Sequence, residues 1–141
     1  MPGNKLTVGL INNKLASCPD TPNCVSSESK AVKNKVKPFT FTGSPKAAWC
    51  DLIKSVKETG GKIKENKDNY LWAVYTSKVF RFKDDLECRM DIKNNTIEIR
   101  SASRVGYSDF GVNRKRVDTL RLEFQNNQDK TMNSNKDKLN P

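Results

Sequence analysis

The sequence predicts a single α+β domain in which two helices pack on one face of an antiparallel sheet of about five strands. The chain has 141 residues, which is the ordinary size of one domain. Residues 62–103 contain four strand-like segments with short connections, and short connections join antiparallel neighbours. One amphipathic helix precedes these segments and a second follows them. With one more strand at the start, the expected order is β-α-β-β-β-β-α.

The first strand and the first helix come before these four segments. VKPFTF, residues 36–41, is a short strand candidate, and its Pro38 indicates a sheet edge because proline cannot donate a ladder hydrogen bond. Ser44 followed by Pro45 offers an N-cap and a proline at the first helical position. Apolar residues then recur at helical spacing as far as Gly60, which predicts that the helix ends there.

The four strand candidates after this helix are residues 62–65, 70–76, 79–93 and 96–103. Strict alternation in the third candidate separates its side chains into two faces. One face holds mainly apolar residues, namely Phe80, Phe82, Leu86, Cys88, Met90 and Ile92. Asp84 falls on this apolar face, whereas Asp85 falls on the charged one. An unpaired carboxylate among apolar side chains is costly, so we expect a cation, hydrogen-bond donors or a proton to match Asp84, unless a bulge turns it outward.

The two ends of the chain have different compositions from the middle. Residues 1–34, which contain the motif CPDTPNC, lack sustained periodicity and predict an extended arm or ordered loop. The last helix is expected over about 114–125, with Val117, Leu120 and Phe124 on one face. Residues 127–141 have almost no apolar content and predict a disordered tail, which leaves 35–126 as the α+β domain.

The chain is strongly basic. It has 26 Lys and Arg against 16 Asp and Glu, a net charge of +10, and such a surplus attracts nucleic acids and anionic membranes. Lysine supplies all the positive charge before residue 81, whereas every arginine lies between residues 81 and 121. Dispersed lysine predicts only weak, salt-sensitive association and no nucleic-acid motif is present, so nucleic acid is a disfavoured partner. The planar fork of arginine suits bidentate contacts with anions, so specific chemistry is expected in the arginine-rich half.

The absence of histidine excludes several kinds of chemistry. It removes the usual acid or base at neutral pH, the commonest metal ligand and every Ser-His or Cys-His catalytic pair. The four cysteines contain no CxxC pair, so we predict no metal site and no cofactor. No run of about 18 apolar residues exists, and we expect no transmembrane segment in this chain.

Cys18 and Cys24 share one loop and leave two interpretations open. They are close enough for a loop-closing disulfide in an oxidising compartment, but they would be two thiols in the cytosol. Residues 1–10 lack a basic segment followed by a long apolar one, which is the pattern of a signal peptide. The chain as it stands therefore predicts a cytoplasmic location.

A polar constellation begins in the last strand and continues beyond it, in the sequence RSASRVGYSDFGVNRKR of residues 100–116. Asn113 is positioned to cap the helix that three consecutive basic residues begin. Cations in the first turn of a helix oppose its dipole, so we expect something negative nearby. The candidates are a ligand with phosphate, sulfate or carboxylate groups, or an internal salt-bridge network that uses Asp84, Asp85 or Asp109.

The chain contains the stretches CPDTPNCVSS (18–27), YLWAVYTSKVFRFKDDLEC (70–88) and RSASRVGYSDFGVNRKR (100–116). With their patterns CPxxPNCVSS, FRFxDDxE and RSxSRxGxxDxGxNRxR, these stretches resemble the signature blocks of the domain-of-unknown-function family numbered 1499. The resemblance spans about residues 10–125 and implies a single small α+β domain without an established reaction. It also implies an export or lipoprotein signal ahead of Gly9, and hence a periplasmic or membrane-anchored lipoprotein if such a signal has been removed.

Carried over residue by residue, the resemblance gives a candidate site made of Asp84, Asp85, Arg100, Ser101, Ser103, Arg104, Gly106, Asp109, Gly111, Asn113 and Arg114. The leading hypothesis is that this site binds a small anionic ligand or an anionic group of a protein partner. The residues expected to contact that ligand are Arg100, Ser101, Ser103, Arg104, Asp109, Asn113 and Arg114.

Two alternatives belong to other classes of function. An enzyme would use Asp84 or Asp85 as general base, with Arg100 or Arg104 stabilising the negative charge that develops. The two aspartates point to opposite faces of their strand, so they form no close dyad without a bulge. In the other alternative the arginines and aspartates form a purely structural network, and the function lies in protein–protein interaction.

Overall fold

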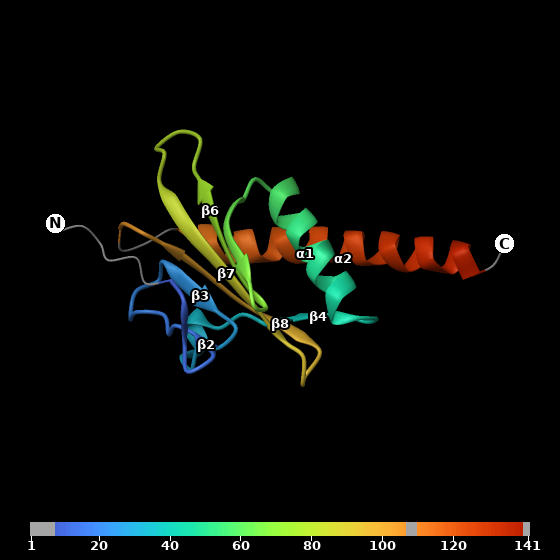
Figure 1. Cartoon of the computed structure of the whole chain (residues 1–141). Helices are drawn as coiled ribbons and strands as arrows, with labels where there is room; N and C mark the ends of the chain where they lie inside the picture. Colours follow the sequence, from blue (N-terminus) through green and yellow to red (C-terminus); the bar gives the residue numbers. More distant parts are fainter. Residues whose placement is uncertain (1–7, 107–109, 140–141) are drawn as a thin grey trace.

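A six-stranded sheet and two α-helices dominate the computed structural model, which describes residues 8–106 and 110–139 (Figure 1). The strands are β3 (Cys24–Ser26), β4 (Phe39–Thr40), β5 (Lys62–Lys67), β6 (Tyr70–Thr76), β7 (Lys83–Asp91) and β8 (Thr96–Ser103). They pair in the order β3-β8-β7-β6-β5, while β4 also pairs with β8, and every pairing is antiparallel. The predicted α+β class is confirmed. The sheet has one strand more than the sequence pattern indicates, because β3 joins it from the N-terminal arm.

The first helix, α1 (Pro45–Glu58), begins as the sequence predicts. The Ser44 hydroxyl oxygen accepts a hydrogen bond from the backbone N–H of Ala47 at 3.1 Å, and Pro45 occupies the first turn, where its missing N–H costs nothing. The helix ends just before Gly60, whose φ of +101° is a left-handed conformation that glycine adopts without strain.

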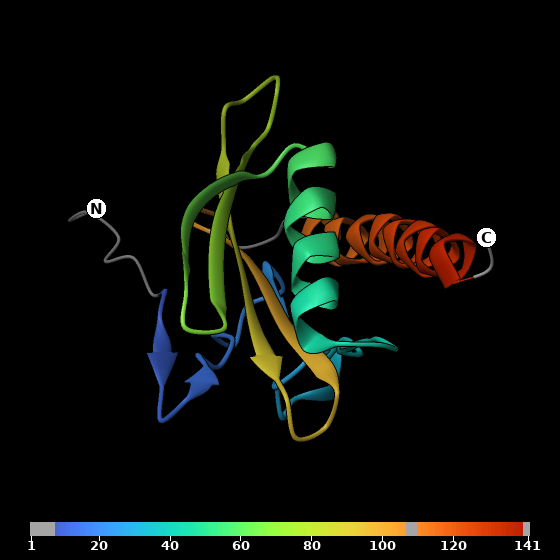
Figure 2. The ribbon, with the colours of Figure 1, turned by 45° about the vertical axis from the view of Figure 1, so that its right-hand side comes forward.

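Both helices pack on the same face of the sheet (Figure 2), as predicted. The core between them and the sheet includes the fully buried side chains Phe39, Leu52, Val56, Leu86, Ile99, Val117, Leu120 and Phe124. The rings of Phe39 and Phe124 stack with centroids 5.5 Å apart and join β4 to the second helix. None of the helices within residues 8–106 and 110–139 combines the length and the apolar character that crossing a bilayer requires.

The N-terminal arm covers the opposite face of the sheet. Its strands β1 (Leu10–Ile11) and β2 (Lys14–Leu15) pair with each other, and β2 contacts β7 and β8. Figure 2 shows these strands on one side of the sheet and the helices on the other. The arm also contains the 3-10 helix η1 (Val32–Asn34). The middle of the charged face of β7 is therefore enclosed, and Glu87 at its centre is fully buried.

The strand predicted over 79–93 is shorter in the structure. β7 covers only Lys83–Asp91, with Leu86, Cys88 and Met90 buried as predicted. Phe80 and Phe82, expected on the core face, are exposed in the turn between β6 and β7, and Ile92 is exposed after β7 ends. The alternation of apolar residues continues beyond the region that the helices cover, so the pattern alone overestimates the strand.

The second helix, α2 (Val112–Leu139), is much longer than the predicted 114–125. Because it begins at Val112, Asn113 lies inside the helix rather than at its N-cap, and that prediction is wrong. The helix also continues through residues 127–139, which corrects the expectation of a disordered tail there; residues 140–141 lie outside the described residues. Polar contacts with α1 stabilise this extension of the helix. Asn127 is buried against α1, where its Nδ2 donates to Ser55 Oγ and Glu58 Oε1, both at 2.8 Å.

Candidate functional site

The predicted site residues divide between the two faces of the sheet. Asp84, Ser101 and Ser103 face the helices, whereas Asp85, Arg100 and Arg104 face the N-terminal arm, because alternate residues of a strand point in opposite directions. Arg114 lies on the exposed side of α2, and Asp109 lies outside the described residues. The structure therefore brings the predicted residues together as two separate networks.

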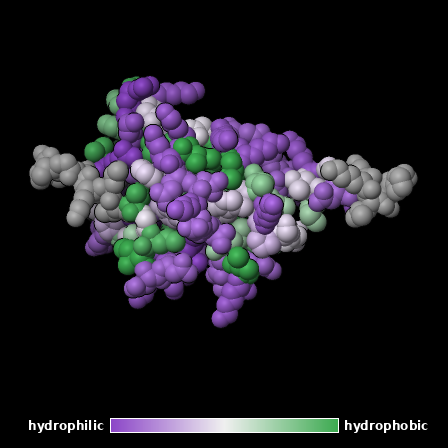
Figure 3. Space-filling model, viewed as in Figure 1, coloured by the Kyte–Doolittle hydropathy of each residue, from purple (hydrophilic) through white to green (hydrophobic). Residues whose placement is uncertain are grey.

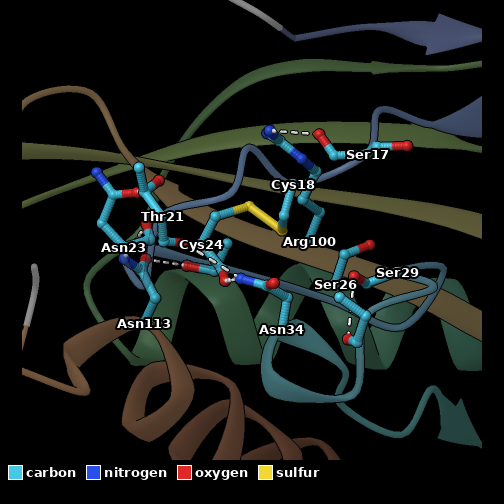
Figure 4. Close-up of a disulfide and its surroundings, with 12 residues drawn as sticks. Ser17, Cys18, Thr21, Asn23, Cys24, Ser26, Ser29, Asn34, Arg100 and Asn113 are labelled. Carbon is cyan, nitrogen blue, oxygen red and sulfur yellow. Dashed lines mark hydrogen bonds between the residues drawn. A yellow bond between two sulfur atoms is a disulfide. The ribbon is translucent and has the colours of Figure 1, made fainter. Parts of the chain in front are cut away.

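Asn113 is the centre of the network on the helix face, where it is completely buried. Its Oδ1 accepts a hydrogen bond from Ser101 Oγ at 2.6 Å. Its Nδ2 donates to Ser103 Oγ at 2.9 Å. The same Nδ2 donates to the backbone carbonyl of Asn23 at 3.1 Å (Figure 4). One amide side chain thus joins α2, β8 and the N-terminal arm.

Arg116 supplies the cation that the sequence requires for Asp84. Its Nη1 donates to Asp84 Oδ2 at 2.7 Å and to Asn113 Oδ1 at 3.1 Å, and its guanidinium carbon lies 4.8 Å from the ring centroid of Tyr75. The expectation that Asp84 is matched by a partner is confirmed. Arg116 is one of the three consecutive basic residues at the start of α2. The negative group that balances its charge is Asp84, a residue of the protein itself.

Asp85 and Arg104 form the outer part of the network on the arm face. Arg104 Nε donates to Asp85 Oδ2 and Nη2 to Oδ1, both at 2.9 Å, which is the bidentate geometry of a strong ion pair. Trp72 Nε1 adds a third hydrogen bond, 2.8 Å long, to Asp85 Oδ1. Each of the two adjacent aspartates is therefore held by an arginine on its own side of the sheet.

Glu87 forms the inner part of the same face and was not among the predicted site residues. It accepts hydrogen bonds from Tyr70 Oη at 2.6 Å and from the backbone N–H of Gly9 at 2.8 Å, and Arg100 Nη1 lies 3.3 Å from its Oε1. Burial raises the pKa of Glu87, although these three partners act in the opposite direction. Burial and the neighbouring Glu87 raise the pKa of Tyr70. The alternation of side chains in β7 places Glu87 on the charged face. Glu87 is buried there because the N-terminal arm packs against that face.

Arg114 contacts the N-terminal arm through backbone groups. Its Nη1 donates to the carbonyl of Lys35 at 3.2 Å and its Nη2 to the carbonyl of Lys33 at 2.9 Å. Arg114, Lys33 and Gly111 line a hollow of about 80 Å³. A space of that size holds only a few water molecules, so it is too small for a metabolite.

Cys18 and Cys24 form a disulfide in the structure, with their Cα atoms 5.6 Å apart (Figure 4). Cys24 belongs to β3 and pairs with Ala102 of β8. Asn34 Nδ2 donates to the carbonyl of Cys24 at 2.9 Å and so connects the same strand to η1. The disulfide closes the loop that leads into β3 and stabilises the arm beside the end of β8.

A groove of about 420 Å³ lies between the end of α1, the end of β6 and the start of α2. Three basic side chains and several hydroxyl groups line this groove, and none of the described residues in its lining carries a carboxylate. The lining residues are Thr59, Gly60, Tyr75, Thr76, Ser77, Lys78, Val112, Lys115, Arg116 and Thr119. Only Nη1 of Arg116 is hydrogen-bonded to the described residues, which leaves Nε and Nη2 unused. The consecutive cations at the start of α2 are the sequence signal for this groove.

Comparisons with known proteins agree with the signature blocks. The sequence model of a family described as "Protein of unknown function (DUF1499)" matches residues 14–124. No curated protein and no solved structure matches the chain. Within residues 8–106 and 110–139, no cluster of three or more Cys, Asp or Glu side chains could hold a metal ion. Because the matched residues include all six strands of the main sheet and the start of α2, the protein belongs to the DUF1499 family.

Proposed function

We propose that the protein binds a small anionic ligand in the groove between α1, β6 and α2. The observation that carries the proposal is the Arg116 guanidinium, which lines this groove with two unused nitrogens while Asp84 and Tyr75 fix its position. A guanidinium that other side chains already hold in one position loses little conformational freedom when it binds an anion. A phosphate or carboxylate group would take the two unused donors.

The charge around the groove favours the same class of ligand. Asp84 compensates the charge of Arg116, so the net attraction comes from Lys78 and Lys115. No carboxylate opposes these two lysines among the lining residues that the structure describes. The N-terminal turn of α2 adds a partial positive charge. The hydroxyl group of Thr119 lies in the lining and can bind the polar remainder of the ligand, whereas the Thr59 hydroxyl already donates to the carbonyl of Ser55 at 2.8 Å. The volume suits a small metabolite.

The residues named from the sequence support the proposal in part. Arg104 is paired with Asp85 on the other side of the sheet, and Arg114 donates to backbone carbonyls of the arm. A ligand that recruited either arginine would have to displace these contacts. The groove lies at the start of the same helix and needs no such displacement, so it is the better position for the predicted anion site.

A catalytic role for Asp84 or Asp85 receives less support. Each carboxylate accepts hydrogen bonds from an arginine, so a substrate would have to compete with that arginine for the carboxylate oxygens. No observation on the described residues favours a reaction over binding.

A thermal-shift titration tests the proposal. Inorganic phosphate, sulfate, citrate and a panel of phosphorylated and carboxylated metabolites are added at low salt to the wild type and to Lys78→Ala/Lys115→Ala. A ligand at 100 times its Kd stabilises the native state by about 2.7 kcal/mol, which raises the Tm measurably. We expect at least one anion to raise the Tm of the wild type and the rise to be lost in the double variant.

Lys46→Ala/Lys54→Ala is the matched control, since it removes two charges from exposed positions of α1 outside the groove. This control should keep the full Tm rise. If the double variant in the groove keeps it as well, or if no anion stabilises the wild type, the groove is not an anion site.

A further inference from the structure

We propose that the end of the β6–β7 hairpin, residues 77–83, inserts into the surface of an anionic lipid bilayer and so docks the domain on membranes. We call this segment the hairpin tip. The inference goes beyond ligand binding in the groove and does not depend on it.

The hairpin tip exposes an unusual amount of apolar surface. Val79, Phe80 and Phe82 are 81%, 71% and 54% exposed, and the two phenylalanine rings stack with centroids 5.5 Å apart. Hairpin turns usually consist of small and polar residues, whereas a cluster of exposed large apolar side chains marks an interaction surface. Figures 1 and 2 show the tip projecting past the end of α1, so nothing in the described chain covers it.

Hydrogen bonds within the turn hold the hairpin tip in this exposed arrangement. The N–H of Ser77 donates to the carbonyl of Phe82 at 2.8 Å, and the N–H of Phe82 donates to Ser77 Oγ at 2.9 Å. Arg81 adopts a positive φ of 58° and donates its N–H to the carbonyl of Ser77 at 3.1 Å. An arginine in the left-handed region is uncommon, so the turn presents the phenylalanines at a conformational cost.

Charge decides which kind of partner fits. Lys78, Arg81 and Lys83 alternate with the apolar residues of the hairpin tip, and the segment contains no acidic residue. The backbone N–H of Arg104 donates to the carbonyl of Lys83 at 3.1 Å, which brings the half-exposed Val105 alongside. Figure 3 shows hydrophobic and hydrophilic surface side by side at this end of the molecule.

An anionic bilayer satisfies both kinds of side chain at once. Phenylalanine and valine enter the boundary between headgroups and acyl chains, while long basic side chains reach back to the lipid phosphates. The negative surface potential of such a membrane attracts the basic segment from within a Debye length. A purely apolar protein surface would leave the three cations unmatched, and a purely acidic one would leave the rings in water.

Co-sedimentation with vesicles tests this inference on the full 141-residue chain. The vesicles are phosphatidylcholine alone or with 30 mol% phosphatidylglycerol as the probe, a composition of about the anionic content that such binding needs. We expect at least a tenfold stronger partition onto the anionic vesicles, falling with added salt. Val79→Ser/Phe80→Ser/Phe82→Ser should lose about tenfold or more of this partition.

Ile11→Ser/Val32→Ser/Leu122→Ser is the control for the apolar change, because these three side chains are also exposed but lie elsewhere. It should bind like the wild type. A Phe80→Trp variant quenched by brominated lipid would demonstrate insertion rather than adhesion. Equal partition of the tip variant and the wild type overturns the proposal. Absence of vesicle binding at low salt also overturns it, and leaves a protein partner as the occupant of the tip.

The two proposals can fail separately. The tip variant retains Lys78 and Lys115, so it should keep the anion-induced Tm rise of the groove, whereas Lys78→Ala/Lys115→Ala retains all three apolar side chains of the tip. Loss of vesicle binding in the tip variant with an unchanged Tm rise is the expected result.

Discussion

Asp85 of β7 and Arg104, the residue directly after β8, face each other as a bidentate pair, with Nε–Oδ2 and Nη2–Oδ1 distances of 2.9 Å. Asp84, the preceding residue, points to the other face and pairs with Arg116 of α2 at 2.7 Å. Two consecutive carboxylates thus form ion pairs on opposite faces of the sheet, one with α2 and the other with the chain that leaves β8. This arrangement explains why the strand carries two acidic residues in sequence.

Arg104→Ala should lower the free energy of unfolding by about 2 kcal/mol, because it leaves Asp85 buried without its cation. Arg104→Lys should fall between this variant and the wild type, since lysine keeps the charge but not the planar fork. Urea unfolding monitored by tryptophan fluorescence measures both. As a control, Arg114→Ala removes an exposed side chain and should cost less than about 1 kcal/mol. Equal stability of Arg104→Ala and the wild type would contradict a structural role for the pair.

Sequence patterns defined the middle of the sheet well. β6 and β8 begin and end at the predicted residues, 70–76 and 96–103, because alternation is regular there and turn-forming asparagines bound both hairpins. β7 was predicted too long because Phe80 and Phe82 continue the alternation into the turn. A period-2 pattern reports which side chains share a face, but it does not report whether anything covers that face.

In the candidate site, too, the sequence pattern shows which residues share a face but not which segment covers that face. Alternation correctly separates Asp84 from Asp85, and the basic start of α2 correctly indicates a negative group nearby, which for Arg116 is Asp84. The burial of Glu87 depends on the arm, whose contacts join residues far apart in the sequence, such as the N–H of Gly9 and the Glu87 carboxylate. No local pattern in the arm indicates this docking, so neither Glu87 nor its partner Tyr70 could be identified beforehand.

Truncation tests whether the C-terminal part of α2, from residue 127 onward, stabilises the domain. Deletion of residues 127–141 should destabilise the protein by about 2 to 4 kcal/mol, because it removes several buried polar contacts with α1. Besides the bonds of Asn127, Thr131 Oγ1 donates to Asp51 Oδ1 at 2.7 Å. Deletion of residues 133–141 keeps those contacts and should change the free energy of unfolding by less than about 0.5 kcal/mol. Urea unfolding distinguishes the two deletions, and equal stabilities would show that the packed part of the helix contributes nothing.

Glu87 should make stability depend on pH. Burial raises the pKa of its carboxyl in the folded protein above the ordinary value of 4.5. Between the unfolded and the folded pKa the native state binds more protons, so stability falls as the pH rises. The contribution of Glu87 is therefore fully present below about pH 4.5 and is lost as the pH rises through the folded pKa.

Tyr70→Phe should increase this pH dependence. The Tyr70 hydroxyl donates to Glu87 Oε2 at 2.6 Å, and a hydrogen bond of this kind stabilises the ionised carboxylate more than the protonated acid. We expect the variant to be less stable than the wild type by about 1 kcal/mol where Glu87 is protonated and by about 2 to 3 kcal/mol where it is ionised. Urea unfolding at intervals from about pH 4 to pH 8 measures the difference across the range over which such a carboxyl titrates.

Tyr75→Phe separates the effect of the carboxylate from the loss of a buried hydroxyl. Tyr75 is buried to a similar extent, but its hydroxyl contacts the uncharged Thr59 hydroxyl at 2.8 Å and the carbonyl of Val56 at 3.4 Å. Neither partner titrates, so the stability lost in Tyr75→Phe should be the same at every pH in the series. A loss in Tyr70→Phe that is equally flat would mean that Glu87 keeps one protonation state throughout the range, and that its burial does not couple folding to pH.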